Sequence, residues 1–218
     1  MGNQLSRSVV NLLWSLARKC GLGPAVLAFY PKSMLVENGW FMSFRCGAPM
    51  DASGQPLPWL TYAFIDFVTP RLHKGLTLFE YGCGFSTVWY CSKVKTVTAV
   101  ENNRVWAQRI EGMLPANGSV LYRQDLQAFA QAIHQVGKVD IIVVDGAARG
   151  ECYKQASSFL TDRGVIIADN SDWADFKEVW PGLEAQGFKA IPFSGITPSH
   201  FVKSQTSILY RSNNCLDI

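Results

Sequence analysis

The sequence predicts an α/β domain with a doubly wound, seven-stranded and mostly parallel sheet, preceded by an N-terminal extension of helices and irregular segments. From residue 76 onward, short apolar runs alternate with helix-like segments. The runs are apolar throughout, which is typical of strands in a parallel sheet that helices cover on both faces. The composition agrees with a sizeable core, because 48% of the residues are hydrophobic and 17% are charged, against about 25% charged in an average soluble domain.

Each predicted strand is a short apolar run bounded by breaks. The seven runs are residues 76–81, 96–100, 119–122, 139–144, 164–168, 188–193 and 206–210. The helix-like segments between them are residues 86–94, 103–113, 126–136, 151–161 and 173–186. Pro181 lies inside the last of these helices, so we expect a kink or a break there. The repeated alternation of strand and helix predicts the doubly wound sheet.

Residues 1–75 lack this alternation and are expected to form an extension of the α/β domain, which comprises residues 76–218. Residues 8–29 are apolar, but Arg18, Lys19 and two glycines interrupt them, so they lack the ~20 clean apolar residues of a membrane-spanning helix. Apolar side chains recur at helical spacing, which indicates a short amphipathic helix. We favour a helix packed on the domain; a helix lying on a membrane surface is the alternative.

The second part of the extension is rich in aromatic residues. Residues 30–59 contain many glycines, prolines and aromatics, and residues 59–68 (WLTYAFIDFV) predict a helix that ends before Pro70. Clustered aromatics usually form core, but beside a ligand cleft they can form a lid and an apolar pocket. We expect Trp59 and Tyr62 to line the ligand cleft and the extension to act as its lid.

The charge balance and the cysteines restrict the partners. The 20 Lys and Arg residues against 17 Asp and Glu give a net charge of +3, which is too small to predict nucleic acid as the main partner. Six scattered cysteines without CxxC spacing argue against zinc and against a disulfide framework. They indicate buried thiols in a reducing cytoplasm. No firm membrane association is expected, and a homodimer stays open.

A glycine-containing turn follows the first predicted strand, in the segment FEYGCGFST. Gly82 and Gly84 allow the backbone to turn sharply and approach a ligand closely. Thr87 stands where the dinucleotide-binding pattern has its third glycine. Glu80 precedes the turn, where a carboxylate repels a pyrophosphate and suits a cationic amino group. The sequence contains no GxxxxGK[ST] pattern of the kind that binds nucleoside triphosphates.

The Glu80-x-Gly82-x-Gly84 segment resembles the first motif of class I S-adenosylmethionine-dependent methyltransferases, which have a Rossmann-like fold. The resemblance covers residues 76–211. It implies that the glycine loop, with Ser86 after it, passes beneath the methionyl part of S-adenosylmethionine. It also implies that Glu80 holds the amino group of this cofactor, directly or through water.

The resemblance continues in order along the chain. Glu101 ends the second predicted strand, where the family places the acid that binds both ribose hydroxyls, and Asn102 follows it; a carboxylate can accept two hydrogen bonds at once. Asp125 and Leu126 follow the third strand, at the position that meets the adenine. Taken singly, Glu101 and Asp125 are equally compatible with ordinary polar residues at strand ends. Asp145 ends the fourth strand, where the family commonly has a residue of the methyl-transfer centre and where open α/β sheets bind ligands.

Asp169 and Asn170 follow the fifth strand and, with Asp145, resemble the magnesium site of catechol-type O-methyltransferases. Three oxygen ligands suit Mg²⁺, and the ion lowers the pKa of an acceptor hydroxyl. Ala148 stands where the catechol enzymes have their base lysine, so the resemblance is incomplete. The alternative is that Asp169 and Asn170 cap the following helix.

Without a metal, a side chain has to accept the proton. His200, in the loop between the last two strands, suits a general base near neutral pH, although a solvated surface histidine is the alternative. Asp145 and Arg149 complete the candidate catalytic residues, since both can bind polar groups of an acceptor and Arg149 suits a carboxylate or phosphate.

The sequence therefore predicts methyl transfer from S-adenosylmethionine to a small-molecule acceptor, at a hydroxyl oxygen. An NAD-linked oxidoreductase or epimerase is one alternative, which Thr87 and Glu80 disfavour. A non-catalytic cofactor-binding scaffold is the other, because the residues do not fix the base.

Overall fold

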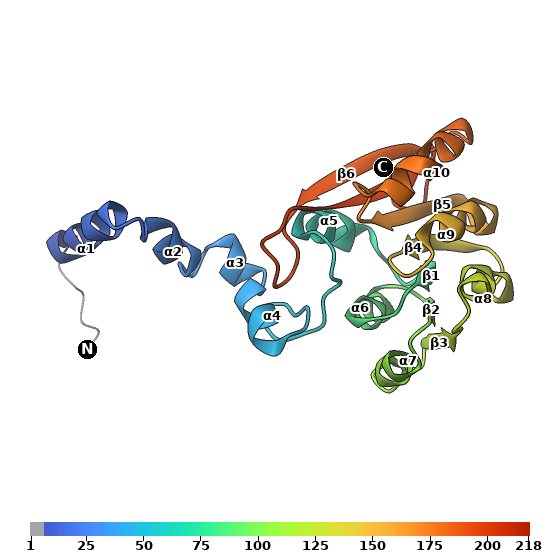
Figure 1. The fold of residues 1–218 in the computed structure, drawn as a ribbon, viewed down its shortest axis with the longest axis horizontal. Coiled ribbons are helices and arrows are strands. Elements are labelled where there is room, and N and C mark those ends of the chain that lie inside the picture. Colours follow the sequence, from blue (N-terminus) through green and yellow to red (C-terminus); the bar gives the residue numbers. More distant parts are fainter. Residues whose placement is uncertain (1–6) are drawn as a thin grey trace.

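The computed structural model describes residues 7–218, and its centre is a seven-stranded sheet (Figure 1). The strand order is β3-β2-β1-β4-β5-β7-β6. Neighbours among β1 to β5 run parallel, whereas β7 is antiparallel to both β5 and β6. Helices cover both faces of this sheet, so the predicted doubly wound, mostly parallel architecture is confirmed.

The strands occupy the predicted apolar runs. Their bounds are β1 (Thr77–Tyr81), β2 (Thr96–Glu101), β3 (Gly118–Tyr122), β4 (Val139–Val144), β5 (Leu160–Asp169), β6 (Lys189–Gly195) and β7 (Ser204–Tyr210). The helices of the domain are α6 (Phe85–Lys93), α7 (Arg104–Glu111), α8 (Leu126–Ala130), α9 (Arg149–Ala156) and α10 (Ala174–Ala185), with short 3₁₀ turns η2 (Gln131–Gln135) and η3 (Ser157–Phe159).

Three helical segments differ from the prediction. In the segment 126–136 the α-helix ends at Ala130 and the 3₁₀ turn η2 follows. α9 ends at Ala156, and the rest of the predicted helix forms η3 and the start of β5, which pairs with β4 from Leu160 onward. α10 continues through Pro181 as one helix and is not broken there. Residues 160 and 161, which the sequence predicts as the end of α9, are therefore in β5 because the strand pairs with β4.

Burial on both faces explains why the strands are apolar throughout. In β4, Ile141 and Val143 belong to the core cluster on one face, whereas Ile142 and Val144 belong to the cluster on the other. All four are fully buried. Successive strand residues point to opposite faces, so a strand covered on both sides requires apolar side chains at every position.

The N-terminal extension divides into two parts that behave differently. α5 (Tyr62–Val68), followed by the 3₁₀ turn η1 (Thr69–Arg71), lies beside the sheet, and α4 (Trp40–Cys46) contacts the loop between β6 and β7. Trp40, Leu60 and Phe64 are buried in the core cluster of that face. Trp59 precedes α5 and is not part of the helix that residues 59–68 predict.

The first part of the extension forms an arm, defined here as residues 7–37. Its helices α1 (Arg7–Lys19), α2 (Gly23–Ala28) and α3 (Met34–Glu37) lead away from the sheet in a line (Figure 1). The favoured expectation of a helix packed on the domain is wrong for α1, because Leu12, Leu13 and Leu16 are exposed. The sheet faces already carry helices from the rest of the chain, and α1 lies beyond them.

Within residues 7–218, no helix combines the length and the apolar character required to cross a bilayer. The cysteines are free; Cys83, Cys91 and Cys152 are buried as expected, whereas Cys20 and Cys46 are exposed.

β1 lies between β2 and β4, at the point where the chain reverses the direction in which it adds strands. Ligands of open α/β sheets bind outside the carboxyl ends of the strands at such a switch point. The fold therefore directs attention to the ends of β1, β4 and β5.

Candidate functional site

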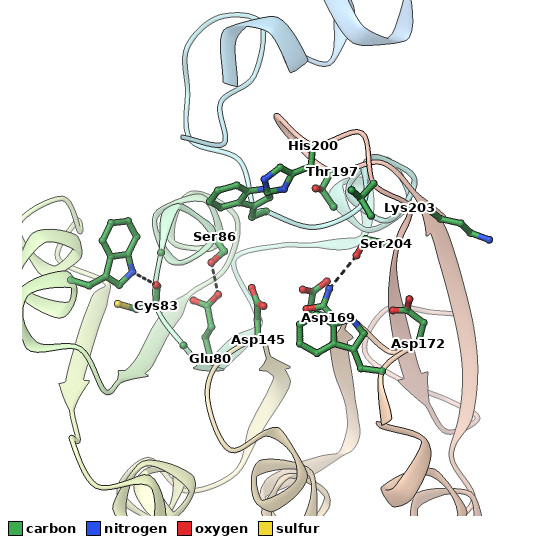
Figure 2. Close-up of a pocket in the computed structure, with 17 residues that line it drawn as sticks. Glu80, Cys83, Ser86, Asp145, Asp169, Asp172, Thr197, His200, Lys203 and Ser204 are labelled. Carbon is green, nitrogen blue, oxygen red and sulfur yellow. Dashed lines mark hydrogen bonds between the residues drawn. The ribbon is translucent and has the colours of Figure 1, made fainter. Parts of the chain in front are cut away.

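A pocket of about 530 Å³ opens at the carboxyl ends of β1, β4 and β5 (Figure 2). This volume lies in the range of small-molecule sites. Its lining comes from the glycine turn, the strand ends and the β6–β7 loop: Trp59, Glu80, Gly82, Cys83, Gly84, Ser86, Trp106, Asp145, Asp169, Asn170, Asp172, Trp173, Thr197, His200, Val202, Lys203 and Ser204.

The glycine turn is held tightly against the end of β4. Gly82 has φ +92°, and a Cβ there would lie 2.9 Å from the carbonyl oxygen of Asp145. Gly146 meets the turn from the other side, since its Cβ would lie 2.7 Å from the Gly82 nitrogen. Gly84 differs, because a Cβ there would meet nothing closer than the Ser86 hydroxyl at 3.7 Å. Gly82 is therefore required by the backbone, whereas Gly84 leaves space on the pocket side.

Glu80 fixes the start of α6. Its carboxylate oxygens accept hydrogen bonds from the hydroxyls of Ser86 and Thr87, each at 2.5 Å. Thr87 Oγ1 in turn accepts from the backbone N–H of Gly84. Glu80 is almost fully buried, and this burial raises its pKa to about 7, against the lowering effect of the two hydroxyls. Glu80 thus joins the first strand to the loop and still lines the pocket.

Asp145 and Asp169 place a second pair of carboxyl groups beside the pocket. Burial raises the pKa of Asp145 well above its usual range, and the charge of Asp169 adds to the rise. Arg149 opposes it through a salt bridge of 3.1 Å between Nη2 and Asp145 Oδ1. Asp169 accepts a hydrogen bond from the Thr206 hydroxyl at 3.0 Å, and burial raises its pKa as well.

Arg149 supports the site from behind the pocket. Its Nε donates to the carbonyl of Gly146 at 3.1 Å, and Nη1 donates to the carbonyl of Asp169 at 2.6 Å. With the bond to Asp145, all three guanidinium nitrogens have partners, and Arg149 does not line the pocket. Its guanidinium ties the end of β4 to the end of β5, and its role in binding an acceptor stays a prediction.

The magnesium interpretation of Asp145, Asp169 and Asn170 is not supported. Residues 7–218 contain no group of three or more His, Cys, Asp or Glu side chains arranged to hold a metal. Arg149 already supplies a cation to Asp145. The Asn170 amide donates to Ser204 Oγ at 3.2 Å. The capping alternative is wrong too, because no side chain caps α10.

The β6–β7 loop and Trp59 face the strand ends from across the pocket. Figure 2 shows Thr197 and His200 opposite the carboxyl groups of Glu80, Asp145 and Asp169. The His200 ring stacks on Trp59 with 5.0 Å between ring centroids. Both aromatic rings come from segments that the fold brings together around the cleft.

Several residues expected from the sequence do not line this pocket. Glu101 is buried, and its carboxylate accepts backbone N–H bonds from Cys83, Asn102 and Asn103. Asp125 caps α8 by accepting from the backbone N–H of Ala128 at 2.8 Å. The others outside the lining are Asn102, Leu126 and Tyr62.

Sequence reasoning missed several lining residues. Trp106 donates its indole N–H to the carbonyl of Cys83 at 2.7 Å and so fixes the glycine turn from α7. Its position on a surface helix gives no sequence signal. Thr197 and Lys203 flank His200 in the β6–β7 loop, and that proximity is a signal that could have found them.

The fold of the chain is similar to those of several solved structures. An O-methyltransferase from Bacillus cereus, solved in complex with SAH, superimposes with a TM-score of 0.59 and 13% identity over 85% of this chain and 97% of that one. Precorrin 8w decarboxylase from Methanobacterium thermoautotrophicum gives 0.55 and 19% identity over 68% and 88% of the two chains. Precorrin-6y C5,15-methyltransferase from Geobacter metallireducens gives 0.53 and 12% identity over 69% and 87%.

These likenesses confirm the predicted methyltransferase fold. No protein-family model and no curated protein sequence matches the chain.

Proposed function

From this fold and pocket, we propose that the chain is an S-adenosylmethionine-dependent methyltransferase that acts on a small molecule at a hydroxyl oxygen. The observation that carries the proposal is the acidic character of a pocket built around a glycine turn at the switch point of the sheet. Glu80, Asp145, Asp169 and Asp172 all line it. The Lys203 ammonium points away from the strand-end carboxyl groups (Figure 2).

The residues fit a cationic cofactor. Gly84 lines the pocket without a close backbone contact, and the nearby carboxyl groups suit an ammonium or a sulfonium. Glu80, Gly82, Gly84 and Ser86 would hold the methionyl end. When bound, S-adenosylmethionine supplies a methyl group on a sulfonium centre.

The NAD alternative receives less support. A pyrophosphate binds best at a helix N-terminus without nearby carboxylates, yet Glu80 lies buried beneath the first turn of α6. Thr87, in place of the third glycine, is committed to Glu80 and Gly84. The acidic lining therefore favours a cationic ligand over a dinucleotide.

The loop opposite the carboxyl groups supplies groups for catalysis, which favours an enzyme over a scaffold. We place the acceptor between His200 and the Asp145–Asp169 pair. The His200 imidazole takes the hydroxyl proton, since its ring lines the pocket opposite the carboxyl groups and an imidazole nitrogen can accept a proton. Trp59 holds the His200 ring by stacking, so the extension contributes one aromatic ring to the side of the cleft that faces the carboxyl groups.

The proposal is tested first by binding. Isothermal titration calorimetry should show binding of S-adenosylhomocysteine and no binding of NAD. At pH 8, above the pKa of the Glu80 carboxyl, Glu80→Gln keeps the shape of the side chain but removes its charge, so it should weaken the binding of S-adenosylhomocysteine by about tenfold or more. Glu111→Gln on the exposed side of α7 is the matched control and should bind normally. Binding of NAD alone would overturn the proposal.

The catalytic part is tested by transfer of labelled methyl to a panel of hydroxylated small molecules. His200→Gln should lower kcat by about 10²-fold and leave the affinity for S-adenosylhomocysteine unchanged. His134→Gln is the control, because His134 is exposed and its ring contacts Gln155 outside the pocket. Cofactor binding without transfer to any acceptor would favour the scaffold.

A further inference from the structure

The arm presents an apolar surface that nothing else in residues 7–218 covers. In α1, Leu12, Leu13 and Leu16 are 61%, 55% and 50% exposed. Further exposed apolar side chains follow on the rest of the arm: Leu22, Val26, Leu27, Phe29, Tyr30 and Met34. Soluble proteins rarely expose a large contiguous set of apolar side chains unless it binds something.

α1 gathers its three exposed leucines on one face, whereas Trp14 lies on the other side among polar residues. At 100° per residue, Leu12, Leu13 and Leu16 fall within one third of the helix circumference. Asn11, Ser15 and Arg18 fall on the opposite side. This pattern is typical of a helix that lies in the boundary between an apolar and an aqueous phase.

The charge of the arm indicates which apolar phase it meets. Residues 1–36 contain no Asp or Glu, and their basic residues are Arg7, Arg18, Lys19 and Lys32. The first acid of the chain is Glu37. A second copy of this arm would bring four basic residues per chain together with one acid, Glu37, which lies at the far end of the arm from α1. An anionic lipid surface complements both the apolar face and the positive charge.

We propose that the arm docks the protein on an anionic membrane surface, with Leu12, Leu13 and Leu16 in the lipid interface and Arg18 and Lys19 at the headgroups. The 13 residues of α1 span about 20 Å, less than the ~30 Å of a bilayer core. The helix therefore lies on the surface. This inference does not depend on the proposed methyl transfer.

Aromatic rings in contact join the arm to the pocket loop. Phe29 stacks on Phe41 of α4 at 4.5 Å, and Trp40 contacts Phe201 at 4.1 Å between ring centroids. The Trp40 indole also donates to the carbonyl of His200 at 3.2 Å. Docking of the arm would therefore hold the β6–β7 side of the pocket near the lipid surface.

Co-sedimentation of the full chain with vesicles tests the docking. The protein should bind vesicles of phosphatidylcholine with 30% phosphatidylglycerol at least tenfold more tightly than phosphatidylcholine alone, and 0.5 M salt should weaken this binding. Equal binding to both vesicles, or binding to neither, would overturn the proposal.

Two matched pairs of variants separate the contributions of the two faces. Leu12→Gln with Leu16→Gln should reduce vesicle binding more than tenfold at unchanged charge. Asn11→Gln with Ser15→Gln alters the polar face and should leave binding within twofold. Unchanged binding of the leucine pair would contradict the docking.

The second pair changes charge. Arg18→Gln with Lys19→Gln should weaken binding to the anionic vesicles at least fivefold. The exposed Lys138 and Lys189 lie before β4 and at the start of β6; Lys138→Gln with Lys189→Gln removes the same charge there and should have a smaller effect. Equal losses from both pairs would show that net charge, not the arm, binds the lipid.

Light scattering and S-adenosylhomocysteine titration complete the test. All four variants should keep the oligomeric state and the S-adenosylhomocysteine affinity of the unmodified chain. Loss of self-association by the leucine pair, without vesicle binding by the unmodified chain, would assign the apolar face to a second copy and overturn the membrane proposal.

Discussion

Strand β4 and helix α1 are both apolar, yet one is buried and the other is exposed. In β4 the apolar side chains alternate between two faces, and each face has a helical layer above it. In α1 the three exposed leucines gather on one face, and the described chain places nothing over that face. Apolar content therefore predicts burial only where other elements of the chain pack against each apolar face of the strand or helix.

The largest expected effect separates these two regions by stability. Ile142→Ala removes a fully buried side chain from β4 and should lower the free energy of unfolding by about 3–4 kcal/mol. Leu13→Ala on α1 is the comparison and should change it by less than about 0.5 kcal/mol. Urea unfolding measures both; a cost at Leu13 similar to that at Ile142 would mean that the arm packs on the domain in solution.

The next effect concerns charge in the two regions. Burial raises the pKa of Glu80 from 4.5 to about 7. The folded chain therefore keeps the proton between pH 4.5 and 7 while the unfolded chain loses it, so this group's contribution to stability falls as the pH rises through that window. Glu80→Gln removes the contribution and should flatten the decline by up to about 3 kcal/mol.

Unfolding in urea at pH 5, 6, 7 and 8 measures this difference. Glu37→Gln, on the exposed α3 of the arm, is the matched control and should follow the profile of the unmodified chain. Parallel profiles for Glu80→Gln and the unmodified chain would show that the Glu80 carboxyl is not desolvated as the structure indicates.

The same comparison explains how much of the fold the sequence predicts. All seven strands could be predicted because a strand that is buried on both faces has a continuous apolar run in the sequence, such as VDIIVV. The start of β5 at Leu160 could not, because pairing with Val139 decides it. The placement of α1 could not either, since an amphipathic helix carries the same pattern whether it meets a domain or another surface.

The candidate site shows a similar limit. Strand ends and a glycine turn were sufficient to find Glu80, Asp145 and Asp169, because sheet topology brings strand ends together. The hydrogen-bond partners of the side chains could not be predicted from the sequence. Glu101 stands at the end of β2 as expected, but backbone N–H groups occupy its carboxylate. The salt bridge between Arg149 and Asp145 likewise depends on the conformation of the turn between β4 and α9.

A third prediction compares two glycines with positive φ. Gly82 has φ +92° and its added Cβ would lie 2.9 Å from a backbone oxygen, whereas Gly21 in the arm has φ +71° and nothing within 4 Å. Gly82→Ala should lower the free energy of unfolding by about 2 kcal/mol and weaken the binding of S-adenosylhomocysteine. Gly21→Ala should cost about 1 kcal/mol and leave binding unchanged. Equal costs would contradict the close approach of the turn to β4.

The smallest effect lies where the two regions meet. Trp40→Phe keeps an aromatic ring against Phe201 but removes the hydrogen bond to the carbonyl of His200, at a cost of about 1 kcal/mol. Hydrogen exchange should quicken in residues 196–203 and stay unchanged in β4, because the lost bond restrains only the loop. Trp14→Phe in α1 is the control and should alter neither. If exchange in the loop does not change, Trp40 does not couple the arm to the pocket, and the two regions behave independently.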